Sequence, residues 1–228
     1  VLPPAGYLKR CYEVVRAAGG VCVADEVQTG LGRFGQWWWG FEQQGVVPDI
    51  VTMGKPCGNG MPLAAVVCSR AVSDAFANGP EYFNTFGGNP VSAAAGLAVL
   101  DEIERLGLKQ RAAATGAALK QGLSTLAQSE DGALIGDVRG SGLFIGIEFV
   151  RNRETREAAS AETSRLCSRL KDHHSILTSI DGPRDNVIVV KPPMCFGPSH
   201  VKILVEAIRL ELRAMRGVDL SEVTHTPT

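Results

Sequence analysis

Two charged residues stand at the ends of apolar runs that are long enough to form strands. Lys55 follows residues 50–53 and Gly54, and Asp25 directly follows residues 21–24. A lysine at such a position either points into water or lies in a cleft, where a lowered pKa prepares its amine to form a Schiff base with a carbonyl. An aspartate there is more often a helix cap or a turn former. Each residue alone is ambiguous, so the two are considered as a pair.

The pair suggests a defined chemistry. Ligands of parallel sheets bind outside the carboxyl ends of the strands, which is where both residues are predicted to lie. There the lysine could hold an aldehyde cofactor covalently, and the aspartate could bind the protonated ring nitrogen of a pyridine. Pyridoxal phosphate requires this arrangement to act as an electron sink. The pairing therefore favours a pyridoxal phosphate site with Lys55 and Asp25 as its catalytic residues.

Three other motifs point to nucleotides only weakly. Residues 30–35 match G-x-G-x-x-G, but no convincing helix follows, as a dinucleotide site requires. Lys55 is followed by Pro56, whereas a phosphate-binding P-loop has Ser or Thr there. The tryptophans at 37–39 could stack on bases, yet without a basic excess a buried wall or a subunit contact is the better interpretation.

Composition limits the class of protein. The chain has 228 residues, of which 45% are hydrophobic and 21% charged, which is typical of a globular protein. No apolar run approaches the length of a membrane span. The net charge of −1 predicts neither nucleic acid nor a membrane as partner. Six scattered cysteines without ligand spacing are interpreted as buried thiols of an intracellular protein, with no metal site. We therefore expect a small-molecule enzyme of the cytoplasm or the mitochondrial matrix.

Apolar periodicity predicts alternating helices and strands in the first part of the chain. The expected order is a helix at 7–18, strands at 21–24 and 50–53 around a short helix at 41–45, and an apolar run at 63–68. Buried strands joined by crossovers predict an α/β layer architecture. Asn89 and Pro90 then form a typical helix start.

The second part changes in composition. Its expected elements are a helix at 108–127, a hairpin or bent strand at 135–150, an amphipathic helix at 151–172, a strand at 187–190 and a closing helix at 200–215. We place a domain boundary near residue 106. The predicted parts are thus 1–106, 107–216 and a loose tail at 217–228.

Three segments resemble the class-III, fold-type I pyridoxal-phosphate-dependent aminotransferases. They read VADEVQTGLGRFG (23–35), PDIVTMGKPCGNGMP (48–62) and EYFNTFGGNPVSAAAGLAVLDEIE (81–104), and the resemblance runs in order to about residue 215. It implies an α/β fold: the C-terminal half of a three-layer α/β/α large domain, followed by a small α+β domain. The N-terminal half of that family, with its phosphate loop and stacking aromatic, is not in this chain. We therefore expect a C-terminal fragment of a homodimeric enzyme, whose activity by itself is open.

The resemblance also implies roles for individual residues. Lys55 corresponds to the Schiff-base lysine, and Asp25 to the residue that pairs with the pyridine nitrogen. Gln28 corresponds to the residue that reaches the 3′-oxygen of the ring. Thr85 is similar to the threonine that binds the cofactor phosphate across the dimer interface, although from the residues alone it would be a turn hydroxyl that caps its own backbone.

Within the family, residues 136–150 and 180–196 look most like the phospho-lyases of ethanolamine phosphate and 5-phosphohydroxylysine. Cys57 and Met61 depart from that branch, which has Met or Ile and His there. The favoured reaction is elimination of phosphate from a phosphorylated amine such as ethanolamine phosphate. The first alternative is a transaminase that moves an amino group to a keto acid, and the second alternative is a truncated, non-catalytic remnant. A phospho-lyase needs cations for its dianionic leaving group, and Arg139 and Lys191 are the substrate-binding candidates.

Overall fold

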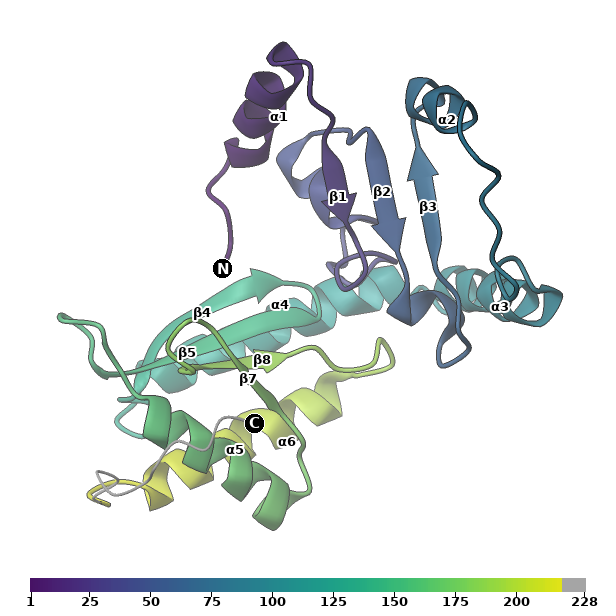
Figure 1. Ribbon diagram of the computed structural model, residues 1–228. Helices are drawn as coiled ribbons and strands as arrows, with labels where there is room; N and C mark the ends of the chain where they lie inside the picture. The colour runs from purple at the N-terminus through teal and green to yellow at the C-terminus, as the bar shows by residue number, and fades with distance from the viewer. Residues whose placement is uncertain (219–228) are drawn as a thin grey trace. The chain divides into compact units, whose positions relative to one another are not determined.

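A computed structural model describes residues 1–218 of the chain. Of the predicted tail at 217–228, residues 219–228 lie outside this range. The described chain divides into two compact units, one of residues Pro3–Gln110 and one that starts at Arg111 and includes Val1–Leu2 (Figure 1). The assignment of residues 1–106 and 107–216 to a large and a small domain stays a prediction.

The first unit contains a three-stranded sheet with helices before and after it. Its elements are α1 (Tyr7–Ala17), β1 (Val23–Asp25), η1 (Gly40–Gln44), β2 (Ile50–Met53), η2 (Lys55–Gly58), β3 (Ala65–Cys68), α2 (Arg70–Phe76) and α3 (Pro90–Arg105). The strand order is β1-β2-β3, with β1 and β2 parallel and β3 antiparallel to β2. The strand at 50–53, the short helix and the Asn89 helix start are confirmed. The strand predicted at 21–24 instead spans Val23–Asp25 and includes the aspartate, and β3 lies within the apolar run at 63–68.

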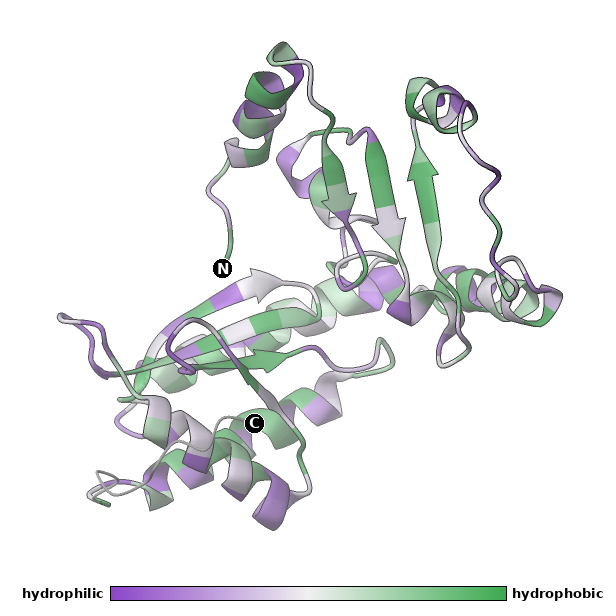
Figure 2. Ribbon diagram, viewed as in Figure 1, coloured by the Kyte–Doolittle hydropathy of each residue, from purple (hydrophilic) through white to green (hydrophobic). Residues whose placement is uncertain are grey.

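Burial in this sheet differs from the expectation. The strands are apolar along most of their length (Figure 2), which predicts buried positions, but β2 is half-buried and β3 is exposed along its length. The buried residues of this unit gather instead around Leu31, Cys57 and Ile103. Trp38 and Trp39, both partly buried, pack against this cluster, as a wall would, whereas the alternative of a subunit contact stays a prediction.

In the residues that the structure describes, the second unit contains a five-stranded antiparallel sheet with three helices. Its elements are α4 (Leu108–Ala127, which begins in the first unit), β4 (Ile135–Ser141), β5 (Phe144–Asn152), β6 (Glu157–Ala158), α5 (Ser160–His174), β7 (Ser179–Asp181), β8 (Val187–Val190) and α6 (Pro198–Ala214). The strand order is β4-β5-β8-β7, and β6 pairs with β5. The helix expected at 151–172 begins only at Ser160, because the charged residues before it extend β5 and form β6.

A tight hairpin and a close helix contact shape this sheet. Ser141 pairs with Phe144, which confirms the hairpin and leaves a two-residue turn. Gly142 opens that turn with φ of 52°, a conformation that favours glycine. Its carbonyl lies against α4 at Gly116, where an added Cβ would approach the oxygen to 2.1 Å. Helix and hairpin can pack this closely only because Gly116 lacks a side chain.

Apolar side chains from all three helices meet one face of the sheet. Along β5, residues Ile145, Ile147 and Phe149 are buried, and the residues between them are partly exposed. Leu119 and Leu123 from α4, Leu166 and Leu170 from α5, and Ile208 from α6 complete this core. The alternation follows from the two-residue period of a strand.

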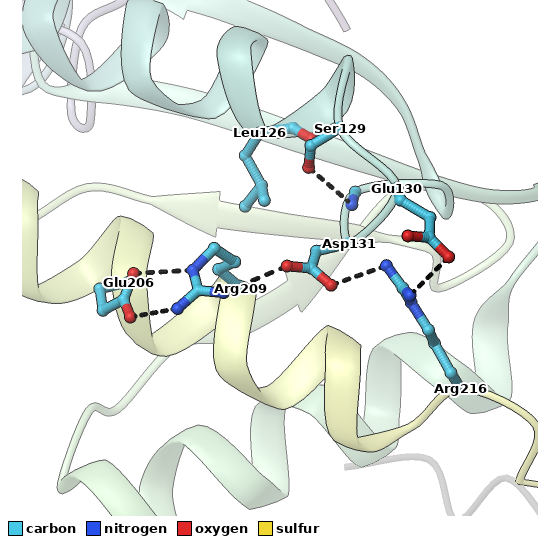
Figure 3. Close-up of polar contacts among 8 residues, drawn as sticks. Leu126, Ser129, Glu130, Asp131, Glu206, Arg209 and Arg216 are labelled. Atoms are coloured by element: carbon cyan, nitrogen blue, oxygen red, sulfur yellow. Dashed lines mark hydrogen bonds and ion pairs between the residues drawn. The ribbon is translucent and has the colours of Figure 1, made fainter.

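Ion pairs join α6 to its neighbours at two places. Arg209 contacts Glu206 and Asp131, and Arg216 contacts Asp131 and Glu130 (Figure 3). These pairs tie α6 to the loop before β4.

Toward α5, the buried Glu211 carboxylate forms the second junction of α6. It is hydrogen-bonded to Arg169, to His173 Nδ1 at 3.0 Å and to His174 Nε2 at 2.8 Å. Burial raises the pKa of Glu211, but the hydrogen bonds from His173, Arg169 and His174 outweigh it and lower the pKa overall.

The cysteines are less uniformly buried than expected. All six are free thiols, and Cys22 and Cys57 are buried. Cys68 and Cys195 are exposed, so the interpretation of all six as buried thiols is wrong. Residues 1–218 include no helix that is both long and apolar enough to cross a membrane.

Candidate active site

Lys55 lies where the backbone leaves β2. Gly54 is buried, and Lys55 itself has φ of 36°, in the left-handed region that residues with a Cβ rarely adopt. Such strain costs about 1–3 kcal/mol and tends to occur at functional sites. The short helix η2 then turns the chain through Pro56 to Asn59. The amine of Lys55 makes no hydrogen bond or ion pair with the residues that the structure describes.

Lys55 lines a cavity of about 540 Å³ within the first unit. The walls come from the turn after η2 and from the turn before α3, and they comprise Gly60, Met61, Pro62, Leu63, Ala64, Asn84, Phe86, Gly87, Gly88, Asn89 and Ser92. Met61 is thus a wall residue, whereas Cys57 is buried beneath, in the unit's core. The resemblance placed both departures from the phospho-lyase branch close to Lys55, and only Met61 borders the cavity.

Asparagine side chains fix the turn before α3. Asn84 Oδ1 accepts hydrogen bonds from the amides of Phe86 at 3.1 Å and Gly87 at 3.0 Å. Asn89 Oδ1 accepts from Ser92 N at 2.9 Å and caps α3. Thr85 is exposed in this turn, next to wall residues but not among them. Since Asn84 performs the capping, the Thr85 hydroxyl is not needed to hold the turn.

Asp25 ends β1 beside the strand that leads to Lys55. The parallel register places Asp25 opposite Thr52, three residues before Lys55. Oδ1 of Asp25 accepts hydrogen bonds from Val27 N at 3.0 Å and from Thr52 Oγ1 at 3.3 Å. Oδ2 accepts none from residues 1–218. Gln28 lies in the exposed turn that follows, and neither Asp25 nor Gln28 borders the cavity.

The sequence analysis missed Glu26, which is only 3% exposed. Its carboxylate accepts hydrogen bonds from Thr29 Oγ1 at 2.6 Å, Gly40 N at 2.8 Å and Phe41 N at 2.9 Å. It therefore fixes the loop after β1 to the start of η1. Strand alternation could have revealed it, because Glu26 continues the buried series of Cys22 and Ala24 while Asp25 lies on the opposite face.

Arg139 and Lys191 belong to the second unit. Arg139, on β4, is paired with Asp137 and Glu148. Burial lowers the pKa of Arg139, and the hydrogen bonds that it donates to these two carboxylates, together with their charges, outweigh burial, so the net pKa is raised. Lys191 is exposed after β8, with Nζ 5.7 Å from the centre of the Phe144 ring. The charge of Arg139 is thus already balanced by two carboxylates.

Comparison with known proteins decides the family. Residues 1–212 match the aminotransferase class-III family. The chain belongs to the class-III aminotransferases. This confirms the resemblance drawn from the three segments and the α/β fold that it implied.

Two relatives and one solved structure show which class-III proteins this chain is similar to. It is 47% identical over 225 residues to the alanine–glyoxylate aminotransferase 2-like protein of Drosophila melanogaster, covering 98% of this chain and 45% of that protein. It is 39% identical over 217 residues to ethanolamine-phosphate phospho-lyase homolog 1 of Caenorhabditis elegans, covering 94% and 46%. A phospholyase from Arthrobacter, solved with phosphoethanolamine, superimposes with a TM-score of 0.89 at 41% identity, covering 94% and 50%. The chain spans about half the length of these relatives.

The residues of this class-III chain fit the cofactor of the family, pyridoxal phosphate. Among residues 1–218, the Lys55 amine has no hydrogen-bond or ion-pair partner, so it can react with the aldehyde carbon. Asp25 supplies a carboxylate oxygen, Oδ2, that accepts no hydrogen bond from the described residues and can receive a ring N–H. The hydroxyl of Thr85 makes no hydrogen bond within the same part of the chain and can donate to a phosphate oxygen. The donor and acceptor types therefore match the three polar ends of the cofactor, whereas residues 1–218 hold no group of three side chains suited to a metal ion.

Proposed function

We propose that this chain carries the lysine and aspartate of a pyridoxal-phosphate-dependent enzyme that acts on a primary amine. The observation that carries the proposal is the placement of Lys55 in the wall of a cavity, two residues after β2, the strand that pairs in parallel with the strand ending at Asp25. An unpaired amine and a carboxylate with a free oxygen thus stand at the same edge of one sheet. This is the edge at which ligands of parallel strands bind.

Each residue of the site has a role toward the cofactor. Lys55 would hold it covalently through Nζ, and Asp25 would accept a hydrogen bond from the ring nitrogen. Gln28 would reach the ring oxygen, and Thr85 the phosphate. When bound, pyridoxal phosphate supplies an electron sink for the carbon that bears the substrate nitrogen. Lys55, once replaced by the substrate amine, would act as the base that removes the proton from that carbon.

We favour a phospho-lyase reaction over amino transfer. In the overall reaction, a phosphorylated amine and water give an aldehyde, ammonia and inorganic phosphate. The proton leaves the carbon that bears nitrogen, the neighbouring C–O bond breaks with its electron pair on phosphate, and water hydrolyses the remaining unsaturated amine. The similarity to the Arthrobacter phospholyase supports this choice, and the similarity to the Drosophila melanogaster protein supports the transaminase alternative.

The test uses the full-length protein that contains this chain. Borohydride reduction of the cofactor-loaded protein, followed by peptide mapping, is expected to place the pyridoxyl group on Lys55. Lys55→Ala should lose the visible absorbance and turnover, whereas Lys9→Ala, a surface variant on α1, should keep both. Label on another lysine would refute the assignment. If the wild-type protein takes up no cofactor, the protein is a non-catalytic remnant.

Two activity assays separate the two reactions. Phosphate release from phosphoethanolamine that requires no keto acid would support the phospho-lyase. Amino transfer that depends on a keto acid, without phosphate release, would support the transaminase.

Lys191 is the candidate for holding the leaving phosphate that is tested first; Arg139 is paired with two carboxylates. Lys191→Ala is expected to lower kcat/KM for phosphoethanolamine by about 1–3 kcal/mol, the range for a hydrogen bond to a charged group. It should leave turnover of an unphosphorylated amine and the cofactor absorbance unchanged. Lys202→Ala, an exposed lysine on α6, is the control. An equal loss for both amines would show that Lys191 only supports the fold.

We also propose that the full-length protein is a homodimer that acts on a small-molecule amine. Light scattering of the cofactor-loaded protein measures its oligomeric state directly. A monomer with full activity would contradict the role of Thr85 across a dimer interface.

A further inference from the structure

The hydroxyl of Thr52 touches the carboxylate that the proposed site needs. Asp25 and Thr52 are register partners on parallel strands, so their side chains leave the same face of the sheet. The Thr52 hydroxyl donates to Asp25 Oδ1 at 3.3 Å. A backbone hydrogen bond of 2.9 Å from Glu26 N to the Thr52 carbonyl joins the same two strand ends. The two side chains are therefore held at a constant separation by the sheet itself.

We propose that Thr52 is a positioning residue for the Asp25 carboxylate in the cofactor site. The inference rests on the proposed function, and it assigns to Thr52 the task of directing Oδ2 toward the ring nitrogen. Both donors to the carboxylate, the Thr52 hydroxyl and the Val27 amide, bind Oδ1. The oxygen without a donor is the one left to accept from the cofactor.

A second donor is needed because the carboxylate would otherwise rotate. The terminal torsion of an aspartate is broad and roughly two-fold, so a single hydrogen bond leaves the plane of the carboxylate loosely defined. The Val27 amide comes from the turn that follows β1 and holds only one side of Oδ1. Thr52 comes from the neighbouring strand, and its β-branched side chain is stiff at χ1. Donors from two different elements define the plane.

Thr52 also links the two proposed catalytic residues. It contacts Asp25 across the strand pair and precedes Lys55, the first residue of η2, by three residues. A shift of β2 along β1 would therefore move the hydroxyl and the lysine together, relative to the aspartate on β1. The purely structural alternative is that Thr52 serves as a β-branched strand residue. Substitutions that separate shape from hydrogen bonding distinguish the two.

The experiment measures the affinity of the full-length apoprotein for pyridoxal phosphate, by titration of visible absorbance. Thr52→Val keeps the shape and strand preference but removes the donor, and it should weaken affinity about 3–10-fold, within the range for the net contribution of a typical hydrogen bond. Thr52→Ser keeps a hydroxyl and should stay within about two-fold of wild type, since the donor is retained.

A double-mutant cycle with Asp25→Ala isolates the positioning role. In the Asp25→Ala background, Thr52→Val should have no further effect on affinity, because the carboxylate it orients is gone. Urea unfolding of the apoproteins should place Thr52→Val at the wild-type midpoint.

Two results would overturn the inference while leaving the proposed function intact. One is a Thr52→Val protein that binds cofactor as wild type does while Asp25→Ala binds it weakly. The other is a Thr52→Val loss that persists unchanged in the Asp25→Ala background, which would mark a structural role. A wild-type protein that binds no cofactor would instead overturn the proposed function, and the role of Thr52 with it.

Discussion

Replacing Glu26 by glutamine should destabilise the loop that carries the aspartate end of the site. The carboxylate is 3% exposed and accepts three hydrogen bonds, two at Oε2 and one at Oε1. Glutamine offers one acceptor oxygen. If that oxygen replaces Oε2, it keeps the bonds from Thr29 and Gly40, and its NH₂ group then faces the amide of Phe41, donor against donor.

The expected loss of stability follows from the number of hydrogen bonds that glutamine cannot make. The variant loses one hydrogen bond to a charged acceptor and leaves a buried amide unpaired, which together cost about 2–4 kcal/mol. Glu42 provides the matched control. It is half-buried at the same short helix and accepts a single bond, from Trp39 N at 2.8 Å, which an amide oxygen can also accept. Glu42→Gln should therefore cost less than about 1 kcal/mol.

Urea unfolding of the full-length protein at pH 7, followed by circular dichroism and tryptophan fluorescence, measures both variants. The three tryptophans at 37–39 precede η1, so their fluorescence reports on the loop that Glu26 holds. A Glu26→Gln loss below about 0.5 kcal/mol, far under the cost of an unpaired buried amide, would refute the reasoning. An equal loss in Glu42→Gln would also refute it, because burial and bond number would then not matter.

Three further predictions concern packing, pH and turnover. Gly116→Ala should cost about 1–3 kcal/mol in urea unfolding, because its Cβ would overlap the Gly142 carbonyl, whereas Gly122→Ala on the same helix meets only a valine methyl at 3.2 Å and should cost less. Glu211 has a lowered net pKa because its arginine and histidine hydrogen bonds outweigh burial, which by itself raises the pKa. Its stabilisation is thus complete above the unfolded-state pKa near 4.5 and lost as pH falls through the folded-state pKa. Glu211→Gln should cost about 1–3 kcal/mol at pH 7 and progressively less below pH 4, and a cost independent of pH would contradict this. Asp25→Asn in the full-length protein should keep the cofactor but lower kcat about a hundredfold, as expected for a lost electrostatic partner, and turnover within about three-fold of wild type would speak against the role.

Local patterns in the sequence were sufficient for most elements. The apolar run that forms β2 and the residues of β8 and α4 were predicted with their observed bounds, because periodicity and flanking glycines act over a few residues. The helix expected at 151–172 failed at its start. Charged residues are compatible with either a helix or an exposed strand, and pairing with β5 decided for the strand.

The sequence by itself also indicated the chemistry of Lys55 and Asp25, since a lysine and an aspartate after two apolar runs are visible in the order of residues. Only the tertiary structure decided which atoms are available to a ligand. It showed that both donors to Asp25 bind Oδ1, one of them from Thr52 on the neighbouring strand. It likewise showed that two carboxylates balance Arg139. The contact of Thr52 with Asp25 joins residues 27 positions apart, and that of Arg139 with Glu148 joins residues 9 apart. Strand register creates such contacts, and no local pattern in the sequence records it.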